Sequence, residues 1–124
     1  MWTYSQSTGR LAHDSTGIVG TGYSGNGAGL NNGEMEAVAG VGPIPRGKWH
    51  ISPWENDHPG LGPIVSHLLP NGFDPFDPHG RSGFFIHGDN ADMDHTASHG
   101  CIVLNKLCRM AMRSSADFDL TVTA

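Results

Sequence analysis

Long apolar runs, basic clusters and cysteines are all scarce in this sequence of 124 residues. No stretch reaches the ~20 consecutive apolar residues of a membrane-spanning helix, so we expect no contact with a membrane. Seven scattered lysines and arginines are outnumbered by twelve aspartates and glutamates, which argues against nucleic acid as a partner. The first residues form neither a basic nor an apolar segment, so we expect cytoplasmic synthesis without a secretory signal.

The chain contains only two cysteines, Cys101 and Cys108. A disulfide between them would close only a small loop, so we expect both thiols to be free. Cys108 falls on or beside the apolar face of a predicted helix, as expected of inert packing. Cys101 instead follows Gly100 and has Ser98 and His99 nearby, a polar setting that favours a nucleophile over a core residue.

Glycine and proline are plentiful, and charged residues make up 15% of the chain. Short alternating segments and many turn residues predict a single domain over residues 1–124, mostly β (α+β), with one short helix. The expected strands are 18–23, 48–52, 64–68, 84–87 and 118–123. We expect 25–33 and most of 53–83 to be loop, and the long second loop to form a lid or the wall of a cleft.

The one helix is expected to run from Lys106 to about Ser115, with Asn105 as its N-cap. Its spacing assigns an inward face and a solvent face. The inward residues are Leu107, Met110, Ala111 and Ser114, and the solvent-facing residues are Lys106, Arg109 and Arg113.

A histidine and a cysteine flank one polar segment, and they are the most informative pair in the chain. The apolar run 84–86 precedes His87, and the small residues 98–100 precede Cys101. A thiol becomes nucleophilic when a base removes its proton, so His87 is the expected general base and Cys101 the expected nucleophile. This pattern predicts a cysteine acyltransferase or peptidase.

The same segment admits a zinc site as a second interpretation, because it is rich in potential ligands. Its spacing matches no firm zinc signature, and clustered aspartates in a loop are usually exposed to solvent, so we expect neither metal nor cofactor. The potential ligands are His87, Asp89, Asp92, Asp94, His95, His99 and Cys101.

The motif at 98–102, Ser-His-Gly-Cys-Ile, with His87-Gly88 upstream, resembles the signature of the YkuD-type L,D-transpeptidases. The proline-glycine turn and strand at 42–51 are similar to that family as well. Residues 2–9 and 20–25 look like the small L,D-transpeptidase-like effectors that bacteria deliver by type VI secretion. The resemblance spans nearly the whole chain.

This resemblance implies a small, mixed, mostly antiparallel β domain that acts on peptidoglycan stem peptides. Cys101 would attack the carbonyl between meso-diaminopimelate and the terminal D-alanine, and His87 would carry the proton. The Gly88 carbonyl would orient His87. The N–H groups of Gly100 and Cys101 would hold the oxyanion, with His99 and Ser98 shaping the pocket.

The resemblance also implies outcomes and partners. Water as acceptor would give an L,D-carboxypeptidase, a free D-amino acid would give exchange, and a second stem would give a crosslink. The chain would be carried by a secretion apparatus, act in the periplasm of a target bacterium, and be blocked by a periplasmic immunity protein that plugs the cleft.

Two departures from the family bear on substrate binding. The interval from His87 to Ser98 is shorter than in housekeeping enzymes, and Val103 occupies a position where many relatives carry arginine or asparagine. The substrate carboxylate would then need another partner, for which Arg46 or Arg81 is the candidate, with Asp89 as a further contact.

Two other classes of function remain open. The first is a papain-like or amidase-type cysteine peptidase, although those enzymes usually place the cysteine before the histidine. The second is a non-catalytic module that binds the cell wall or inhibits through its polar loop.

Overall fold

The computed structural model describes residues 1–70, 77–89 and 97–124. Within them the chain forms short strands, two 3-10 helices and one α-helix, a mostly β fold as predicted. The strands are β1 (Trp2–Ser5), β2 (Arg10–His13), β3 (Gly17–Thr21), β4 (Tyr23–Ser24), β5 (Gly47–Ile51), β6 (Glu55–His58), β7 (Gly62–Pro70), β8 (Phe84–His87), β9 (Ile102–Val103) and β10 (Asp119–Thr123). The helices are η1 (Gly27–Gly29), η2 (Gly33–Met35) and α1 (Lys106–Ser115).

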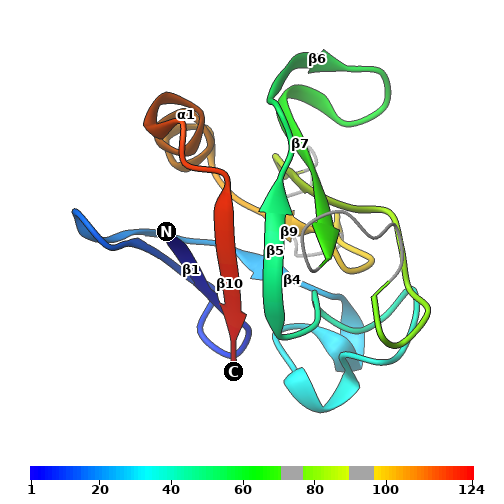
Figure 1. Cartoon of the computed structure of the whole chain (residues 1–124). Coiled ribbons are helices and arrows are strands. Elements are labelled where there is room, and N and C mark those ends of the chain that lie inside the picture. The colour runs from blue at the N-terminus through cyan, green and yellow to red at the C-terminus, as the bar shows by residue number, and fades with distance from the viewer. Residues whose placement is uncertain (71–76, 90–96) are drawn as a thin grey trace.

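The strands form one curled sheet in the order β3-β2-β1-β10-β5-β7-β8-β9-β4, and β6 pairs with β7 beside this path. The two end strands, β3 and β4, follow each other in the chain with only Gly22 between them, so the sheet turns back on itself, with β5 and β10 in front and β4 and β9 behind (Figure 1). Gly22 is required here, because a Cβ atom on it would lie 2.0 Å from the carbonyl oxygen of Val103.

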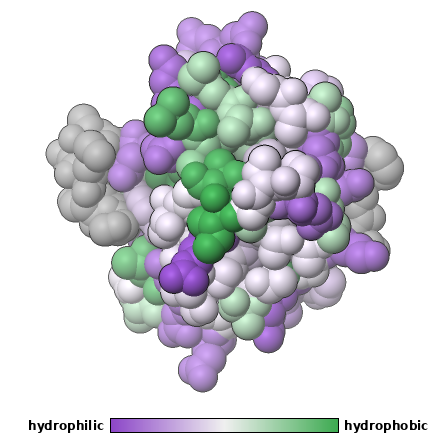
Figure 2. Space-filling view, turned by 90° about the vertical axis from the view of Figure 1, so that its left-hand side faces the viewer, coloured by the Kyte–Doolittle hydropathy of each residue, from purple (hydrophilic) through white to green (hydrophobic). Residues whose placement is uncertain are grey.

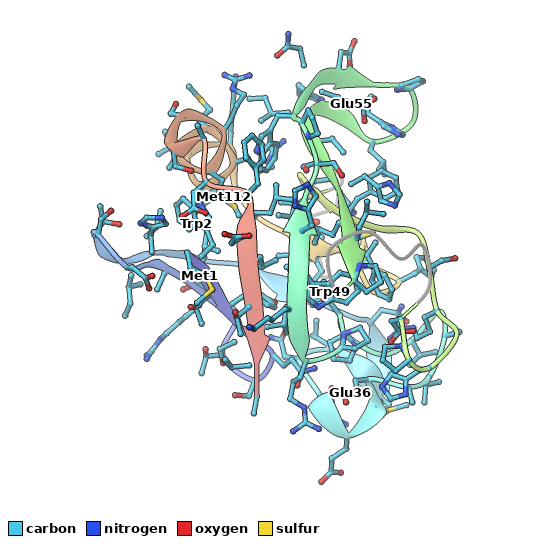
Figure 3. The ribbon with its side chains drawn as sticks, viewed as in Figure 1. Met1, Trp2, Glu36, Trp49, Glu55 and Met112 are labelled. Carbon is cyan, nitrogen blue, oxygen red and sulfur yellow. The ribbon has the colours of Figure 1, made fainter. Side chains whose placement is uncertain are left out.

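Residues that alternate along the strands fill the core, as their period predicted. Trp49 and Ile51 of β5 are buried, and so are Leu120 and Val122 of the neighbouring β10. Trp49 lies against Phe84 with ring centroids 4.9 Å apart, and Figure 3 shows it next to β5 and β7. Hydrophobic burial of these alternating residues therefore holds the central strands together.

The expectation that 53–83 is mostly loop is wrong for its first half. This stretch forms the β6–β7 hairpin, and β7 runs for nine residues from Gly62 to Pro70. Its prolines avoid the middle of the strand, because Pro59 lies in the hairpin turn, Pro63 is the second residue of β7 and Pro70 is its last residue. The number of prolines in this stretch predicted a loop, but their positions, in the turn and near the ends of β7, are compatible with a strand.

The helix begins and ends as predicted, but its buried face is different. The Asn105 side chain accepts a hydrogen bond from the N–H of Cys108 at 2.8 Å, which satisfies an orphan donor of the first turn. Cys108 and Met112 are buried one turn apart, whereas Leu107 is 78% exposed. Met112 and Trp2 lie close together between the helix and the sheet (Figure 3).

Arg109, which the spacing assigned to solvent, is buried with a relative exposure of 6%. Within the described parts of the chain its guanidinium hydrogen-bonds only to backbone carbonyls, so it can be buried there without a carboxylate partner. Helical periodicity assigns apolar residues to the buried face and every arginine to solvent. The buried face of α1 was predicted wrongly because Arg109 does not follow this pattern.

The surface carries mixed polar and apolar residues. The face that includes α1 and the tip of the β2–β3 hairpin shows a small apolar patch among polar atoms (Figure 2). Ile18 of β3 and Leu107 of α1 are the most exposed large apolar residues of the described chain. In the part of the chain that the structure describes, α1 is too short and too polar to cross a membrane.

Candidate active site

Strand β8 places His87 in the middle of the sheet. It pairs antiparallel with β7 and parallel with β9, and in the second pair Ile86 lies opposite Ile102 and His87 opposite Val103. Both isoleucines are fully buried in the core, so strand alternation directs His87 to the other face. Cys101 directly precedes β9, and the register therefore places it beside Phe85, one step diagonally from His87, at roughly 8 Å between Cα atoms.

The His87 ring is held in one orientation. It is buried, and its Nδ1 atom lies 2.6 Å from the carbonyl oxygen of Gly88. A carbonyl can only accept, so Nδ1 carries the proton and Nε2 has a free lone pair. No described residue hydrogen-bonds to Nε2. Burial lowers the pKa of His87, the Gly88 carbonyl opposes this, and the Arg109 charge adds to the lowering. The imidazole is therefore a neutral base at neutral pH.

The Cys101 thiol is free, half-buried and uncharged at rest. Its Sγ atom lies 3.7 Å from the Gly83 carbonyl oxygen. Burial raises the pKa of Cys101, while the Phe85 N–H, the Arg81 charge and the N–H of Cys101 itself oppose that rise. Among the described residues the thiol makes no hydrogen bond to the His87 ring. The sheet thus brings the two residues onto neighbouring strands, and the resting thiol faces the β8 backbone.

Ser98 shapes the turn that carries Cys101. Its fully buried hydroxyl donates to the Cys101 carbonyl at 2.6 Å and accepts from the N–H groups of Gly25 and Gly100 at 2.9 and 3.2 Å. Gly100 adopts φ +134°, and a Cβ atom on it would lie 2.5 Å from Nη2 of Arg81. Ser98 and Gly100 of the Ser-His-Gly-Cys motif therefore have a structural role, because they set the conformation of the turn before Cys101.

This geometry does not fit one expected role of Gly100. Its N–H donates to Ser98 in the resting structure, so it is not available as the oxyanion donor that the resemblance implied. The N–H of Cys101 helps to lower the pKa of its own thiol, so it remains a suitable donor. The place of Gly100 in the motif comes from its backbone conformation and from the close approach of Arg81.

Arg81 does not fit the role of a carboxylate partner for the substrate. Its relative exposure is 6%, and its guanidinium donates to four carbonyl oxygens, including those of Gly42 and His99 at 3.1 and 3.2 Å. The other two belong to Glu36 and Pro43, and the charge also lies 5.0 Å from the centre of the Phe84 ring. Arg81 instead fastens the 36–43 segment to the turn that carries Cys101.

The other two candidate substrate contacts already have protein partners. Arg46 is exposed and pairs through two nitrogens with the carboxylate of Glu36, at 3.1 and 3.3 Å. Asp89 accepts a hydrogen bond from the Tyr23 hydroxyl at 2.7 Å. A substrate would have to compete with Glu36 for Arg46, and Asp89 is a surface acceptor beside the site.

An open cleft of about 330 Å³ adjoins His87. His99 lines it, as expected of a pocket residue, and its ring lies 3.2 Å from the Gly40 carbonyl oxygen. Gly60 and Leu61 of the β6–β7 turn form another wall, which agrees with the expected role of the long proline-rich stretch. The Cys101 side chain does not line this cleft in the resting structure, because it points to Gly83.

Sequence reasoning missed three residues that build the site. Tyr23 hydrogen-bonds through its hydroxyl to Asp89 and to the Ala97 N–H, the latter at 3.2 Å. Ser24 donates to the Gly100 carbonyl at 3.1 Å, and Arg109 lies behind Gly88. Only Tyr23 and Ser24 had a usable signal, since they lie in the 20–25 segment that resembles the effectors.

The zinc interpretation finds no support in the described residues, where no three potential ligands come together. Asp92, Asp94 and His95, which this interpretation needed, lie outside the described residues.

Comparison with known proteins adds one finding. A family model described as the Tlde1 domain matches residues 19–118, a span that includes His87, the Ser98–Cys101 turn and α1. The match supports an antibacterial effector of type VI secretion, a class that is secreted into target cells and is in general paired with an immunity protein. No curated protein and no solved structure matches the chain.

Proposed function

The chain belongs to the Tlde1 domain family, and from that premise we propose that it is a cysteine L,D-carboxypeptidase or L,D-transpeptidase acting on peptidoglycan stem peptides. The observation that carries the proposal is the placement of His87 on β8 and of Cys101 immediately before the neighbouring parallel strand β9. His87 is neutral, and its Nδ1–H is fixed by the Gly88 carbonyl. This arrangement suits a base that takes the proton of a nearby thiol.

The first half of the reaction forms an acyl-enzyme. The Cys101 side chain rotates from the Gly83 carbonyl toward His87, and Nε2 takes the thiol proton as sulfur attacks the carbonyl that precedes the terminal D-alanine. The N–H of Cys101 stabilises the negative oxygen of the tetrahedral intermediate. The C–N bond then breaks, His87 returns the proton to the leaving amine, and a thioester remains on Cys101.

The second half regenerates the thiol. Water or the amine of a D-amino acid attacks the thioester, with His87 again accepting the proton, and the thiolate of Cys101 leaves and is reprotonated. Water gives the trimmed stem, and a D-amino acid gives an exchanged stem. The roughly 330 Å³ cleft beside His87 is open, which lets a small acceptor reach the thioester. We therefore propose trimming or exchange in the periplasm of the target cell.

The raised pKa of Cys101 decides how the thiol is activated. Because burial keeps it protonated, the site does not begin from a thiolate–imidazolium ion pair. Proton transfer to His87 must accompany the attack, and activity requires neutral His87. Since the pKa of His87 is lowered, we expect the acidic limb of kcat/KM to lie below the ordinary histidine value of 6.5.

Mass spectrometry of purified tetrapeptide muropeptides tests the proposal. The wild-type protein should remove the terminal D-alanine, or replace it when a D-amino acid is added, and Cys101→Ala should do neither. Cys108→Ala is the matched control, because Cys108 is a free thiol in the core and its loss should leave the products unchanged. Intact muropeptides after incubation with folded wild-type protein would refute this activity.

The same preparation separates the two other classes of function. A cysteine amidase or endopeptidase would release fragments other than D-alanine, and these would depend on Cys101. A wall-binding module would sediment with peptidoglycan while leaving its composition unchanged, and Cys101→Ala would sediment equally well. Iodoacetamide sharpens the distinction, because loss of activity should follow alkylation of Cys101 and not of buried Cys108.

We further propose that the immunity protein of this effector blocks the cleft formed by the β6–β7 turn and His87. Leu61 lines that cleft together with His87 and His99, so Leu61→Arg should weaken the complex. Leu107→Arg on the exposed face of α1 is the control. A complex that is lost with Leu107→Arg and kept with Leu61→Arg would place the immunity protein elsewhere.

A further inference from the structure

Arg109 is a buried cation without a carboxylate partner among the described residues. Its Nε donates to the Leu104 carbonyl oxygen at 3.1 Å, and Nη1 donates to the carbonyl oxygens of Pro63 and Ile64. Burying a charge is costly unless its hydrogen-bonding groups are satisfied. An apolar side chain of similar length would fill the same space without that cost, so the guanidinium calls for an explanation beyond packing.

The guanidinium lies directly against the residue that orients the candidate base. A Cβ atom on Gly88 would lie 2.7 Å from Nη2 and 3.1 Å from Cζ of Arg109. The carbonyl of that same Gly88 receives the Nδ1–H of His87 at 2.6 Å. The chain of contacts thus runs from Arg109 through the Gly88 backbone to the His87 ring.

Arg109 also holds an unusual backbone conformation on the other side of His87. Ile64 has φ +56°, which is a genuine outlier for a β-branched residue. Its carbonyl and that of Pro63 are the acceptors of Nη1. Ser66 pairs with Ile86, so the same register puts Val65, the next residue after Ile64, across from His87. One guanidinium therefore fixes the backbone on both sides of His87.

We propose that Arg109 is a positioning residue for His87, which it orients by clamping Gly88, the strained Ile64 and the end of β9 to one another. Its effect on catalysis rests on the proposed function. Its effect on the His87 ring does not, because the contacts that carry it belong to the folded protein alone. Arg109 touches neither substrate nor Cys101 in this account.

The groups that face His87 set the direction of the expected change. Burial is the main cause of its lowered pKa, with the charge of Arg109 on α1 and His58 on β6 adding to it. The Gly88 carbonyl and Asp89 act in the opposite direction. The Arg109 charge lowers the pKa of His87, and the Asp89 charge raises it. Without Arg109 the pKa of His87 should therefore rise, and the acidic limb of the pH–activity profile should move to higher pH.

The test compares Arg109→Met, Arg109→Lys and the control Arg113→Met. Arg113 lies one turn further along α1, is exposed and donates a hydrogen bond to the Asn56 side chain at 3.3 Å. For Arg109→Met we expect kcat to fall on the order of 100-fold with little change in KM, as for a misplaced catalytic group. Arg109→Lys keeps the positive charge but cannot reach all three carbonyls. Compared with Arg109→Met, it should therefore bring the acidic limb of the pH–activity profile closer to that of the wild type than it brings kcat. Arg113→Met should match the wild type.

Nitrogen-15 NMR of the His87 ring supplies a readout that needs no substrate. In the wild type we expect the Nδ1–H tautomer and titration below 6.5, and in folded Arg109→Met a raised pKa with a mixture of tautomers. If Arg109→Met retains the wild-type kcat and His87 titration, the proposal is overturned. Should that variant not fold, a wild-type His87 in the Nε2–H tautomer would overturn it equally. Absence of activity on muropeptides alone would count against the proposed function and leave the NMR result to decide the role of Arg109.

Discussion

The two halves of the sheet are stabilised in different ways. The scaffold half, made of β1, β2, β3, β5 and β10, is held by strand pairing and by alternating buried residues such as Leu11, Trp49 and Leu120. The site half, made of β4, β7, β8 and β9, contains strands as short as two residues. Its loops are tied by Ser98, Arg81 and Arg109, which hydrogen-bond to backbone groups.

Buried polar residues divide between the halves in the same way. The described residues of this kind are Gln6, Ser24, Ser66, Asp77, Arg81, His87, Ser98 and Arg109. Of these only Gln6 lies in the scaffold half. The family match runs from 19 to 118, so it includes the whole site half and leaves out β1, β2 and β10. Burial of apolar side chains thus stabilises the scaffold half, whereas hydrogen bonds from polar side chains to the backbone stabilise the site half.

Removing the candidate base, His87, should give the largest loss of activity with the smallest loss of stability. His87→Ala should lower kcat/KM by about 10²–10⁴-fold, because general base catalysis is lost, while the apolar ladder remains. Steady-state release of D-alanine measures this, with His79→Ala in the loop before β8 as the control. Equal rates for wild type and His87→Ala would remove His87 from the mechanism.

A change in the scaffold half should do the reverse. Leu120→Ala removes a core side chain that is 1% exposed, so we expect unfolding free energy to fall by about 2–5 kcal/mol. Activity per folded molecule should be kept. Urea denaturation with Leu107→Ala as the exposed control measures the difference. If fully folded Leu120→Ala lost activity, the distinction between a scaffold half that confers stability and a site half that confers activity would be wrong.

Ser98→Ala should weaken both properties at once. It removes a buried hydroxyl with three backbone partners around Cys101, and leaving such groups unsatisfied costs about 1–3 kcal/mol. The turn should loosen, so D-alanine release should fall as well. Ser5→Ala, whose exposed hydroxyl reaches the Ala124 carbonyl at 2.8 Å, is the matched control. A Ser98→Ala variant with wild-type stability and activity would contradict this role.

Glu36 joins the two halves, and it should give the smallest effect. Burial alone would raise its pKa, but hydrogen bonds from Arg46 and Gln6 outweigh burial and lower it to about 2. A carboxyl with a lowered folded pKa stabilises the protein above its ordinary value of 4.5, and that stability is lost as pH falls toward 2.

Urea denaturation between pH 2 and 6 measures this contribution. Glu36→Gln should be less stable than the wild type at pH 6, and the difference should shrink as the pH falls toward 2. A difference independent of pH would show that the charge of Glu36 contributes nothing.

The sequence predicted only part of the scaffold half: period-two alternation marked β5 and β10, because it reports burial directly, whereas no strand was expected at β1 or β2. The strands around Trp49, Ile86 and Leu120 and the Asn105 cap lie where the pattern put them. The pattern failed at β7, where proline position matters more than proline number, and at α1, where Arg109 is buried. At α1 the deciding interactions are hydrogen bonds from Arg109 to backbone carbonyls, which no side-chain pattern records.

The candidate site could be predicted only as far as its motif. Residue types and order named His87, Gly88, Ser98, His99, Gly100 and Cys101 as a group. The partners of Arg46 and Arg81 could not be foreseen, because Glu36 and the carbonyls of Gly42 and His99 are distant in the sequence. The hydrogen bond from the Gly100 N–H to the Ser98 hydroxyl joins near neighbours, but it depends on the conformation of the turn, which residue types alone do not reveal.

The central claim is that Cys101 forms a thioester with the substrate, and intact-protein mass spectrometry tests it most directly. The protein would be mixed with a tetrapeptide stem and quenched in acid at successive times. We expect a transient adduct with the mass of the tripeptide acyl group, mapped to Cys101 and absent from Cys101→Ala. D-alanine release by wild-type protein without any adduct on Cys101, together with equal release by Cys101→Ala, would contradict the account.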